Sequence, residues 1–398
     1  MNLMEKIVSL CKRRGFIFPG SEVYGGFAGT YDYGHLGLAL KNNIKQSWWK
    51  KFVDGRRDMY GVDAALIMNP KVWEASGHVA GFLGTTAEGK KFNEMFKTEV
   101  GTGEEATISY LRPETAQGMF VNFKNTVDAF HPKLPFGIAQ IGKAFRNEIA
   151  PRDFLFRQRE FEQMEIEYFV RKEDWEKYFE YWKEEMVSWM KEVGVDMSLV
   201  HELEVSEEDR AHYSKRTIDF EFEYPFGRKE LFGLAYRTDF DLKNHKLDYV
   251  DEEKGEKIVP HVIEPTFGVD RAFLVLLLSA YKEDEKDGEV RSYLKFKPNI
   301  APVICAVSPL LKNKPELVDY AENKVYAPLK AKFGRVAWDD NGNIGKRYRR
   351  QDEIGTPFCI VVDFDTLSDD SVTVRDRDTG EQERVKVEDL ENYIKGKI

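Results

Sequence analysis

The sequence is poor in cysteine and has no hydrophobic run long enough to span a bilayer. Its 398 residues include three cysteines, Cys11, Cys305 and Cys359, and no C-x-x-C pair. A membrane-spanning helix needs about 20 apolar residues, and the longest candidate run, residues 272–280, is soon followed by charge. These absences exclude a disulfide framework and a cysteine-based zinc ribbon, and they predict no membrane partner.

The N-terminal residues and the histidines also lack recognisable signals. Residues 1–14 have the pattern of an amphipathic helix, without the small-residue cleavage site of a signal peptide. The seven histidines include no H-E-x-x-H and no other metal-ligand spacing. We therefore expect a cytoplasmic protein without zinc.

The overall composition is that of a folded, acidic protein. A net charge of −10 excludes a protein that coats nucleic acid with its whole surface, although it allows a local basic patch. Apolar residues make up 42% of the chain, which is enough for a sizeable core. The length predicts two or three domains, and no internal repeat or low-complexity tract is present.

Hydrophobic periodicity predicts a mostly antiparallel sheet with inserted helices in the first part of the chain. Apolar residues recur at helical spacing over residues 1–14, 36–53 and 175–193. Between residues 137 and 170 the period becomes two, which predicts two strands joined by a polar loop. Further strands are expected at 220–224, 231–236 and 258–263. The aromatic stripe of the helix at 175–193 is interpreted as core.

After a charged, proline-terminated stretch at 282–298, the pattern changes to alternating strands and helices. Strands expected at 303–307, 335–338, 359–363 and 371–375, with a helix at 316–333, predict a small parallel-dominated sheet. The predicted fold class is therefore α+β. Residues 1–298 form the first domain, with a helical insertion at about 172–215 and a linker at 282–298, and residues 299–398 form an α/β domain.

The expected strand pair carries the densest chemical signal. Alternation places Arg146 beside small residues on one strand, and Arg157, Phe161 and Glu165 on one face of the other. The arginines could grip phosphate oxygens, Phe161 could stack on a base, and Glu165 could accept from an ammonium group. A solvated strand is the alternative interpretation.

Two motifs resemble those of the class II aminoacyl-tRNA synthetases. The first is Phe145-Arg-Asn-Glu148, followed after a loop by Arg157-Gln-Arg-Glu-Phe161, and it resembles motif 2. The second is Phe267-Gly-Val-Asp-Arg271 before an apolar helix, and it resembles motif 3. Other blocks are similar to those of the glycyl-tRNA synthetases of the single-chain dimeric type: residues 22–29, 68–78, 111–118, 263–266 and 345–357.

This resemblance covers nearly the whole chain and implies both a fold and a function. The implied fold is a class II antiparallel-sheet catalytic domain followed by an α/β anticodon-binding domain. The implied enzyme is a glycine–tRNA ligase, which forms glycyl-adenylate from glycine and ATP and then transfers glycine to the 3′ end of tRNA(Gly). The implied ligands and partners are ATP, Mg²⁺, glycine, tRNA(Gly) and a second copy of the chain.

The resemblance also implies roles for residues of the ATP site. Arg146 would hold the α-phosphate and Arg157 would reach the γ-phosphate, with adenine between Phe161 and Arg271. Glu230 would help to hold Mg²⁺ on the phosphates. The complete implied ATP site is Arg146, Asn147, Glu148, Phe156, Arg157, Gln158, Arg159, Glu160, Phe161, Glu230, Leu231, Gly268, Val269, Asp270 and Arg271.

Two further sites follow from the same resemblance. The implied glycine site is Glu114, Phe161, Glu162, Gln163, Met164, Glu165, Glu264, Pro265, Thr266, Phe267 and Gly268. In the second domain, the basic residues Lys346, Arg347 and Arg350 beside Tyr348 imply contacts with the tRNA backbone. A solvated helix start is the alternative for this basic segment.

Three positions depart from the family pattern. Motif 1 has His35 where the family has proline, and the motif 2 loop has Phe154 near a position that is usually glycine. Between residues 81 and 96 the chain is short, where relatives often carry an insertion, some with metal-type cysteines. We interpret the chain as a trimmed enzyme without zinc.

Two alternative functions stay open. A class II synthetase of the prolyl, threonyl or histidyl type would need pocket residues other than Glu114, Glu165 and Glu264. A non-catalytic, synthetase-like accessory protein that binds nucleic acid would be marked by loss of the ATP arginines or of Glu230, and all of these are present.

Overall fold

The computed structural model describes residues 2–85, 89–211, 213–252, 254–286 and 289–398. Its larger sheet has seven strands in the order β10-β11-β12-β15-β9-β8-β3, antiparallel except for the edge pair β3 and β8. The strands are β3 (Met59–Gly61), β8 (Phe136–Phe145), β9 (Glu160–Val170), β10 (Val200–Glu204), β11 (Arg216–Tyr224), β12 (Gly227–Thr238) and β15 (His261–Gly268). The predicted antiparallel sheet, with its strand pair between residues 137 and 170, is confirmed.

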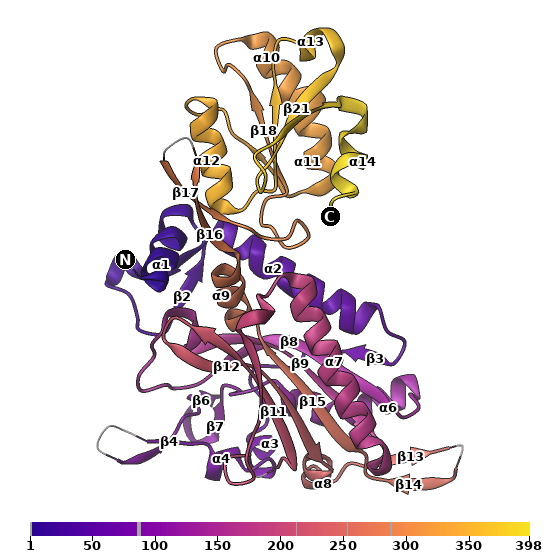
Figure 1. The fold of residues 1–398 in the computed structure, drawn as a ribbon. Coiled ribbons are helices and arrows are strands. Elements are labelled where there is room, and N and C mark those ends of the chain that lie inside the picture. The colour runs from indigo at the N-terminus through magenta and orange to yellow at the C-terminus, as the bar shows by residue number, and fades with distance from the viewer. Residues whose placement is uncertain (1, 86–88, 212, 253, 287–288) are drawn as a thin grey trace.

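Three helices cover one face of this sheet (Figure 1): α2 (His35–Trp49), α7 (Trp175–Val193) and α9 (Val269–Ala280). Because side chains alternate along a strand, Met164 and Ile166 of β9 point toward these helices and join the main core. Trp48 of α2 and Trp189 of α7 are fully buried, and both rings pack against Phe267 of β15. The alternate residues of β9 therefore face the other side of the sheet.

The helix boundaries follow local sequence signals. In α1 (Leu3–Arg14), Asn2 and Glu5 form a reciprocal capping box, and Gly15 ends the helix in the left-handed conformation at φ 73°. Gly194 ends α7 in the same way at φ 95°. The helix α2 continues into a π-helical turn at Lys50–Asp54. The three helices predicted in this part of the chain are confirmed.

Shorter helices and hairpins lie around the sheet. Helices α5 (Ala116–Val121) and α6 (Phe123–Phe130) pack against one end of it. The other short helices are α3 (Pro70–Ala75), α4 (His78–Gly81) and α8 (Phe240–Asn244). The hairpins are β1 (Ile17–Pro19) with β2 (Tyr31–Tyr33), β4 (Leu83–Thr85) with β5 (Lys91–Asn93), β6 (Lys97–Val100) with β7 (Thr107–Tyr110), and β13 (Tyr249–Asp251) with β14 (Glu256–Ile258).

Two predicted segments need correction. The stretch 172–215 is not wholly helical, because β10 follows α7 and pairs with β11 as an edge strand of the main sheet. The stretch 282–298, predicted as a linker, contains most of the hairpin of β16 (Tyr281–Lys286) and β17 (Glu289–Leu294), whose residues 287–288 lie outside the described residues. The charged residues of this stretch led to the prediction of a linker. In the structure, Arg291 is buried with acidic partners and Leu294 is fully buried.

The C-terminal part is a five-stranded sheet in the order β19-β18-β20-β21-β22. β18 is parallel to both β19 and β20, but β21 is antiparallel to both β20 and β22. The sheet is therefore half parallel, and the prediction of a parallel-dominated sheet is corrected. The strands are β18 (Cys305–Pro309), β19 (Val336–Trp338), β20 (Phe358–Val362), β21 (Ser371–Asp376) and β22 (Gln382–Lys386). The strand β22 was not predicted, because most of its residues are polar and exposed.

Helices cover this smaller sheet. The predicted helix at 316–333 is a continuous run of α10 (Pro315–Tyr320), a π-helical turn (Ala321–Tyr326) and α11 (Ala327–Phe333). The other helices are α12 (Ile344–Ile354), α13 (Thr366–Asp369) and α14 (Leu390–Lys395). Among the residues that the structure describes, no helix in either part is long and apolar enough to cross a membrane.

The helix α12 lies where the two parts of the chain meet, beside β17 and α1 (Figure 1). Asp352 of α12 is buried and accepts from Arg291 of β17 at 3.0 Å and from Arg375 of β21 at 2.8 Å. Glu353 pairs with Arg13 of α1 at 3.4 Å. These ion pairs join the C-terminal sheet to the hairpin and to the N-terminal helix.

Candidate active site

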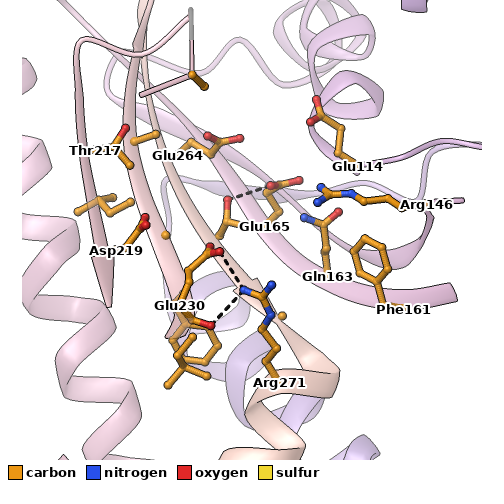
Figure 2. Close-up of a pocket in the computed structure, with 18 of the residues that line it drawn as sticks. Glu114, Arg146, Phe161, Gln163, Glu165, Thr217, Asp219, Glu230, Glu264 and Arg271 are labelled. Atoms are coloured by element: carbon orange, nitrogen blue, oxygen red, sulfur yellow. Dashed lines mark hydrogen bonds and ion pairs between the residues drawn. The ribbon is translucent and has the colours of Figure 1, made fainter. Parts of the chain in front are cut away.

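A cavity of about 340 Å³ lies on the face of the large sheet that carries Glu165 (Figure 2). Strands β9, β11, β12 and β15, the loop after β8 and the start of α9 contribute to its wall. Many residues of the implied sites line it: Glu114, Arg146, Glu148, Phe156, Arg157, Gln158, Phe161, Glu162, Gln163, Glu165, Glu230, Leu231, Glu264, Thr266, Gly268, Asp270 and Arg271. The structure thus brings motifs 2 and 3 together.

Other residues of the implied sites do not line this cavity. Met164 and Phe267 are fully buried in the core on the opposite face, because strand alternation turns them away. Val269, the first residue of α9, is also fully buried in that core. Pro265 and Asn147 are also outside the lining. For Met164, Phe267 and Val269, the implied side-chain contact with a ligand is corrected to a packing role, whereas the contacts implied for Asn147 and Pro265 stay predictions.

Arg159 and Glu160 are outside the lining as well. The guanidinium of Arg159 donates to the backbone oxygens of Glu148 at 3.0 Å and Ala28 at 2.6 Å. Glu160 pairs with Lys143 on the neighbouring strand. Their side chains therefore hold the start of β9 in place.

Asp270 lines the cavity, but both of its carboxylate oxygens accept hydrogen bonds from protein groups. It accepts from the hydroxyl of Tyr33, from Lys41 at 3.0 Å and from the backbone N–H of Glu162 at 2.7 Å. These bonds tie motif 3 to β2, α2 and β9. Asp270 therefore supports Arg271, the next residue, and its implied contact with ATP stays a prediction.

Three carboxylates gather at one end of the cavity: Glu114, Glu165 and Glu264 (Figure 2). Glu165 is 2% exposed and accepts from the hydroxyls of Thr115 and, at 2.9 Å, of Thr266. Burial and the charge of Glu114 raise the pKa of Glu165. An end lined by acceptors of this kind suits an ammonium group.

The guanidinium of Arg237 balances part of this negative charge, and the sequence did not identify it. Arg237 is 1% exposed and donates to Glu264 at 2.7 Å and to Asp241 at 2.8 Å and 2.9 Å. Burial nevertheless raises the pKa of Glu264 well above its ordinary value, against the opposing effect of Arg237. The sequence feature that could have identified Arg237 is an arginine within an apolar strand, Leu234-Ala-Tyr-Arg237.

Glu114 differs from the other two carboxylates. Burial disfavours its charge, but His78 and Arg237 outweigh burial and hold the pKa of Glu114 well below its ordinary value. Its two oxygens lie 3.3 Å from His78 Nε2 and 3.2 Å from Gln117 Nε2. Glu114 is therefore the most firmly ionised acceptor at this end of the cavity.

Arginines and carboxylates pair with one another at the other end of the cavity. Arg271 Nη1 lies 3.0 Å from Glu230 Oε2 and donates to the backbone oxygen of Glu230 at 3.1 Å (Figure 2). Desolvation opposes ionisation of Glu230, but Arg271 outweighs it and lowers the pKa. Arg157 similarly contacts Glu148 at 2.6 Å. These pairs hold phosphate-binding groups in place without nucleotide.

Arg146 is held between two rings. Its guanidinium lies 5.4 Å from the centroid of Phe82 and 5.2 Å from that of Phe161, and its Nε donates to the backbone oxygen of Pro113 at 3.1 Å. The guanidinium of Arg271 lies over Phe156, 4.5 Å from the ring centroid. Flat, electron-rich surfaces therefore accompany both arginines.

The motif 2 loop has an unusual backbone where glycine was noted as missing. Asp153 and Phe154 both have positive φ, 60° and 56°. A bulky residue in this region is strained, and here the Phe154 ring packs edge-on against Tyr31 with centroids 5.2 Å apart. That packing offsets the strain and anchors the loop.

Asp219 of β11 is a second carboxylate beside Glu230, which the sequence did not identify. Both approach the open side of Gly233, where an added Cβ would lie 3.7 Å from Glu230 Oε1 and 4.0 Å from Asp219 Oδ1. Burial, together with the charge of Glu230, raises the pKa of Asp219 to about 7. Two oxygen donors beside a phosphate site fit Mg²⁺, which binds proteins through one or two carboxylates plus phosphates.

The basic residues of α12 are divided between the interior and the surface. Arg347 is 3% exposed and donates to the backbone oxygens of Asp340 and Gly342, both at 2.9 Å. Arg350 pairs with Asp339 at 2.6 Å. The prediction that Arg347 contacts tRNA is therefore wrong, and Arg350 is committed largely to the protein. Lys346 is exposed, as is Arg349.

Comparison with known proteins bears on both parts of the chain. Residues 96–281 match the model of the tRNA synthetase class II core domain (G, H, P, S and T), and residues 304–397 match that of an anticodon binding domain. Among curated relatives, the glycine–tRNA ligase of Lachnospira eligens is 46% identical, with 99% of each chain covered. That of Thermus thermophilus is 43% identical, also with 99% of each chain covered.

The relatives carry segments that this chain lacks. The alignment with the Lachnospira eligens ligase extends over 461 positions, 63 more than the residues of this chain. The alignment with the Thermus thermophilus ligase extends over 499 positions. A shorter chain than its relatives agrees with the interpretation of a trimmed protein.

Proposed function

This chain belongs to the glycine–tRNA ligase family of class II aminoacyl-tRNA synthetases, and we propose that it activates glycine with ATP and transfers it to tRNA(Gly). One observation carries the proposal: a single cavity holds three carboxylates at one end and Arg146 and Arg271 nearby. An ammonium acceptor beside phosphate-binding groups is what the formation of an aminoacyl-adenylate requires.

In the first step, a carboxylate oxygen of glycine attacks the α-phosphorus of ATP and pyrophosphate leaves on the opposite side. The transition state spreads negative charge over phosphate oxygens, and Arg146, Arg157 and Arg271 are the groups that would stabilise it. Nucleotide would replace the Glu148 and Glu230 carboxylates as partner of Arg157 and Arg271. No covalent nucleophile is needed, because positioning and charge stabilisation suffice.

In the second step, a hydroxyl of the terminal ribose of tRNA attacks the carbonyl carbon of the adenylate. AMP leaves, and the glycyl group forms an ester with the ribose. The anchored motif 2 loop, with Phe154 packed on Tyr31, supports a fixed surface beside the cavity for the acceptor end of tRNA.

A divalent cation would be held by Glu230 and Asp219 together with the ATP phosphates. Mg²⁺ there would neutralise charge on the departing pyrophosphate. The repulsion between the two carboxylates, which contributes to the raised pKa of Asp219, would be relieved by the cation. The sequence interpretation that no zinc is needed remains a prediction.

Glycine is selected by charge and by lack of space. Glu114, Glu165 and Glu264 would surround its ammonium group, and a larger amino acid would have to place its Cβ against these buried side chains. Because no smaller amino acid competes with glycine, exclusion by size needs no editing site.

We also propose a homodimer that uses the surface beside motif 1. Val23 and Tyr24 are each 92% exposed, Phe27 is 64% exposed and Leu38 of α2 is 50% exposed. Exposed apolar residues close together in sequence are typical of a protein interface. Trp49 of α2 is half-buried and packs over Gly61 of the same chain, so the proposed interface does not include it. Light scattering that shows an active monomer would contradict the dimer.

The remaining parts of the proposal concern tRNA and cell compartment. Residues 1–298 would form the catalytic domain and residues 299–398 the anticodon-binding domain, with Lys346 and Arg349 of α12 facing the tRNA backbone. We propose that the enzyme acts in the cytoplasm, where tRNA is charged. The prolyl, threonyl and histidyl alternatives are disfavoured by the family membership, and the non-catalytic alternative by the presence of every ATP arginine.

The direct test is exchange of radioactive pyrophosphate into ATP by the purified full chain. We expect exchange that depends on glycine and on Mg²⁺. Exchange that is absent with glycine, or that proline, threonine or histidine supports better, would contradict the proposal.

A further inference from the structure

The segment of residues 68–78 was singled out in the sequence, but the proposed mechanism gives it no role. Its last residue, His78, lies outside the cavity lining. The His78 Nε2 atom is nevertheless 3.3 Å from Glu114 Oε2, and both side chains are nearly buried, with exposures of 10% and 12%. A residue that does not line the pocket therefore contacts one of its three carboxylates.

Local sequence signals explain why His78 lies there. Asn69 caps α3 and Pro70 occupies its first turn, while Trp73 is fully buried and fixes the helix to the core. Gly77 then takes the left-handed conformation at φ 83°. This turn brings the His78 ring back onto Ser76, two residues earlier.

The ring of His78 is held on all sides. Ser76 Oγ lies 2.8 Å from Nδ1, the ring of Trp73 meets it edge-on at 5.4 Å, and that of Phe82 lies 5.5 Å away. The backbone oxygen of His78 accepts from Asn93 Nδ2 at 3.0 Å. A side chain fixed in this way can orient a partner.

Hydrogen-bond chemistry fixes the direction of the two contacts to Glu114. A carboxylate can only accept, so His78 Nε2 carries a proton and donates it to Glu114. The hydroxyl of Ser76 lies 2.8 Å from Nδ1 and can donate to it or accept from it. The second oxygen of Glu114 accepts from Gln117 Nε2 at 3.2 Å. The two donors set the rotation of the carboxylate and leave its remaining lone pairs for a ligand.

We propose that His78 is a positioning residue that orients Glu114 and thereby sets the affinity for glycine. This inference rests on the proposed function. Geometry supports this role, because His78 and Gln117 contact different oxygens of Glu114. The pKa directions agree with it, since Glu165 and Glu264 have raised pKa values whereas Glu114 has a lowered one. His78 acts on Glu114, the carboxylate of the three that most readily carries the negative charge needed to bind an ammonium group.

The test compares His78→Ala with His78→Gln in glycine-dependent pyrophosphate exchange. A hydrogen bond to a charged group that is lost leaves its partner unsatisfied, so His78→Ala should raise KM for glycine roughly tenfold or more. KM for ATP should stay within about threefold of the parent. Glutamine keeps an N–H donor near the position of Nε2, so His78→Gln should restore most of the glycine affinity.

Two controls make the result specific. His201 also pairs with a glutamate, Glu223, at 2.7 Å, but it lies on the edge strand β10 and outside the cavity. His201→Ala should leave both KM values unchanged. In a Glu114→Ala background, adding His78→Ala should cause no further change in KM for glycine, because the residue through which His78 acts is gone.

The outcomes separate the inference from the function on which it rests. A parent without glycine-dependent exchange contradicts both. If the parent is active, the inference is overturned by a His78→Ala variant whose KM for glycine stays within threefold of the parent. It is also overturned if KM for ATP rises equally, or if folded His78→Gln gives no rescue.

Discussion

The guanidinium of Arg271 is paired with Glu230, with Nη1 and Oε2 3.0 Å apart, across the floor of the cavity. One residue comes from motif 3 and the other from β12, and the family pattern assigns one to ATP and the other to its metal ion. The two groups that would receive ATP and Mg²⁺ thus already hold each other in place. ATP binding would then exchange one charged partner for another and would not bring in new charges.

Removing either arginine of the phosphate site should impair activation strongly. Groups that stabilise charge in a transition state are typically worth roughly 3–4 kcal/mol, so Arg146→Ala and Arg271→Ala should each lower kcat/KM in pyrophosphate exchange about 100-fold or more. Arg228→Ala is a suitable control, because that side chain is 50% exposed and lies outside the cavity lining. Activity within tenfold of the parent in both variants would contradict the assigned site.

Asp219→Asn should increase the Mg²⁺ requirement. The substitution removes one negative oxygen donor while keeping the shape of the side chain, and cation affinity depends on the number of charged ligands. We expect the Mg²⁺ concentration for half-maximal exchange to rise about fivefold or more, with activity largely restored at high Mg²⁺. Asp128→Asn, at an exposed residue of α6, should have no effect. If the Mg²⁺ dependence of Asp219→Asn equals that of the parent, Asp219 does not belong to the metal site.

Glu167→Gln should stabilise the protein at alkaline pH. Glu167 is fully buried, neither of its oxygens has a hydrogen-bond partner among the described residues, and burial and the nearby Glu264 raise its pKa well above the ordinary value. A carboxyl group with a raised folded-state pKa contributes stability below its unfolded pKa, and this is lost as pH rises through the folded pKa. Glutamine is neutral throughout and avoids that loss.

The measurement is the thermal midpoint of Glu167→Gln and the parent at pH 5 and pH 8. The variant should melt higher than the parent at pH 8, by about 1 °C for each kcal/mol in a chain of this size, and the difference should shrink at pH 5. Glu207→Gln, at a side chain that is 93% exposed, should show no such pattern. A variant that is less stable at pH 8 would contradict the argument.

Substitutions in α12 should separate tRNA binding from folding. Lys346→Ala with Arg349→Ala should raise KM for tRNA and reduce its salt dependence, while glycine-dependent exchange stays near normal. Arg347→Ala should instead lower the thermal midpoint, because it leaves buried backbone oxygens without their donor. Unchanged charging by the double variant would remove this surface from the tRNA site.

The strand residues of the site could be predicted because alternation and spacing fix their face. Gln163 and Glu165 line the cavity while Met164 points into the core, which is the period of two in the sequence. Asp219 could not be found in this way, because Arg216-Thr-Ile-Asp219 also fits a solvated strand. Its role appears only when β11 pairs with β12 and Asp219 lies opposite Gly233.

Other differences between the sequence predictions and the structure arise because charged side chains are buried. Arg347 lies four residues before Gln351 and seven before Ile354, on the buried face of α12, so helical spacing could have identified it as interior. The hairpin β16–β17 was predicted as a linker because of its charged residues. Arg291 there is satisfied by Asp284 and by Asp352, which is 61 residues away in sequence. Sequence periodicity carries no signal for such a distant partner.

The most direct test of the central claim is charging of unfractionated tRNA by the purified full chain with each of the twenty amino acids. The account predicts attachment of glycine in an ATP-dependent reaction, with alanine as a poor substrate because its Cβ does not fit among Glu114, Glu165 and Glu264. Efficient attachment of any other amino acid, or no attachment of glycine, would contradict it.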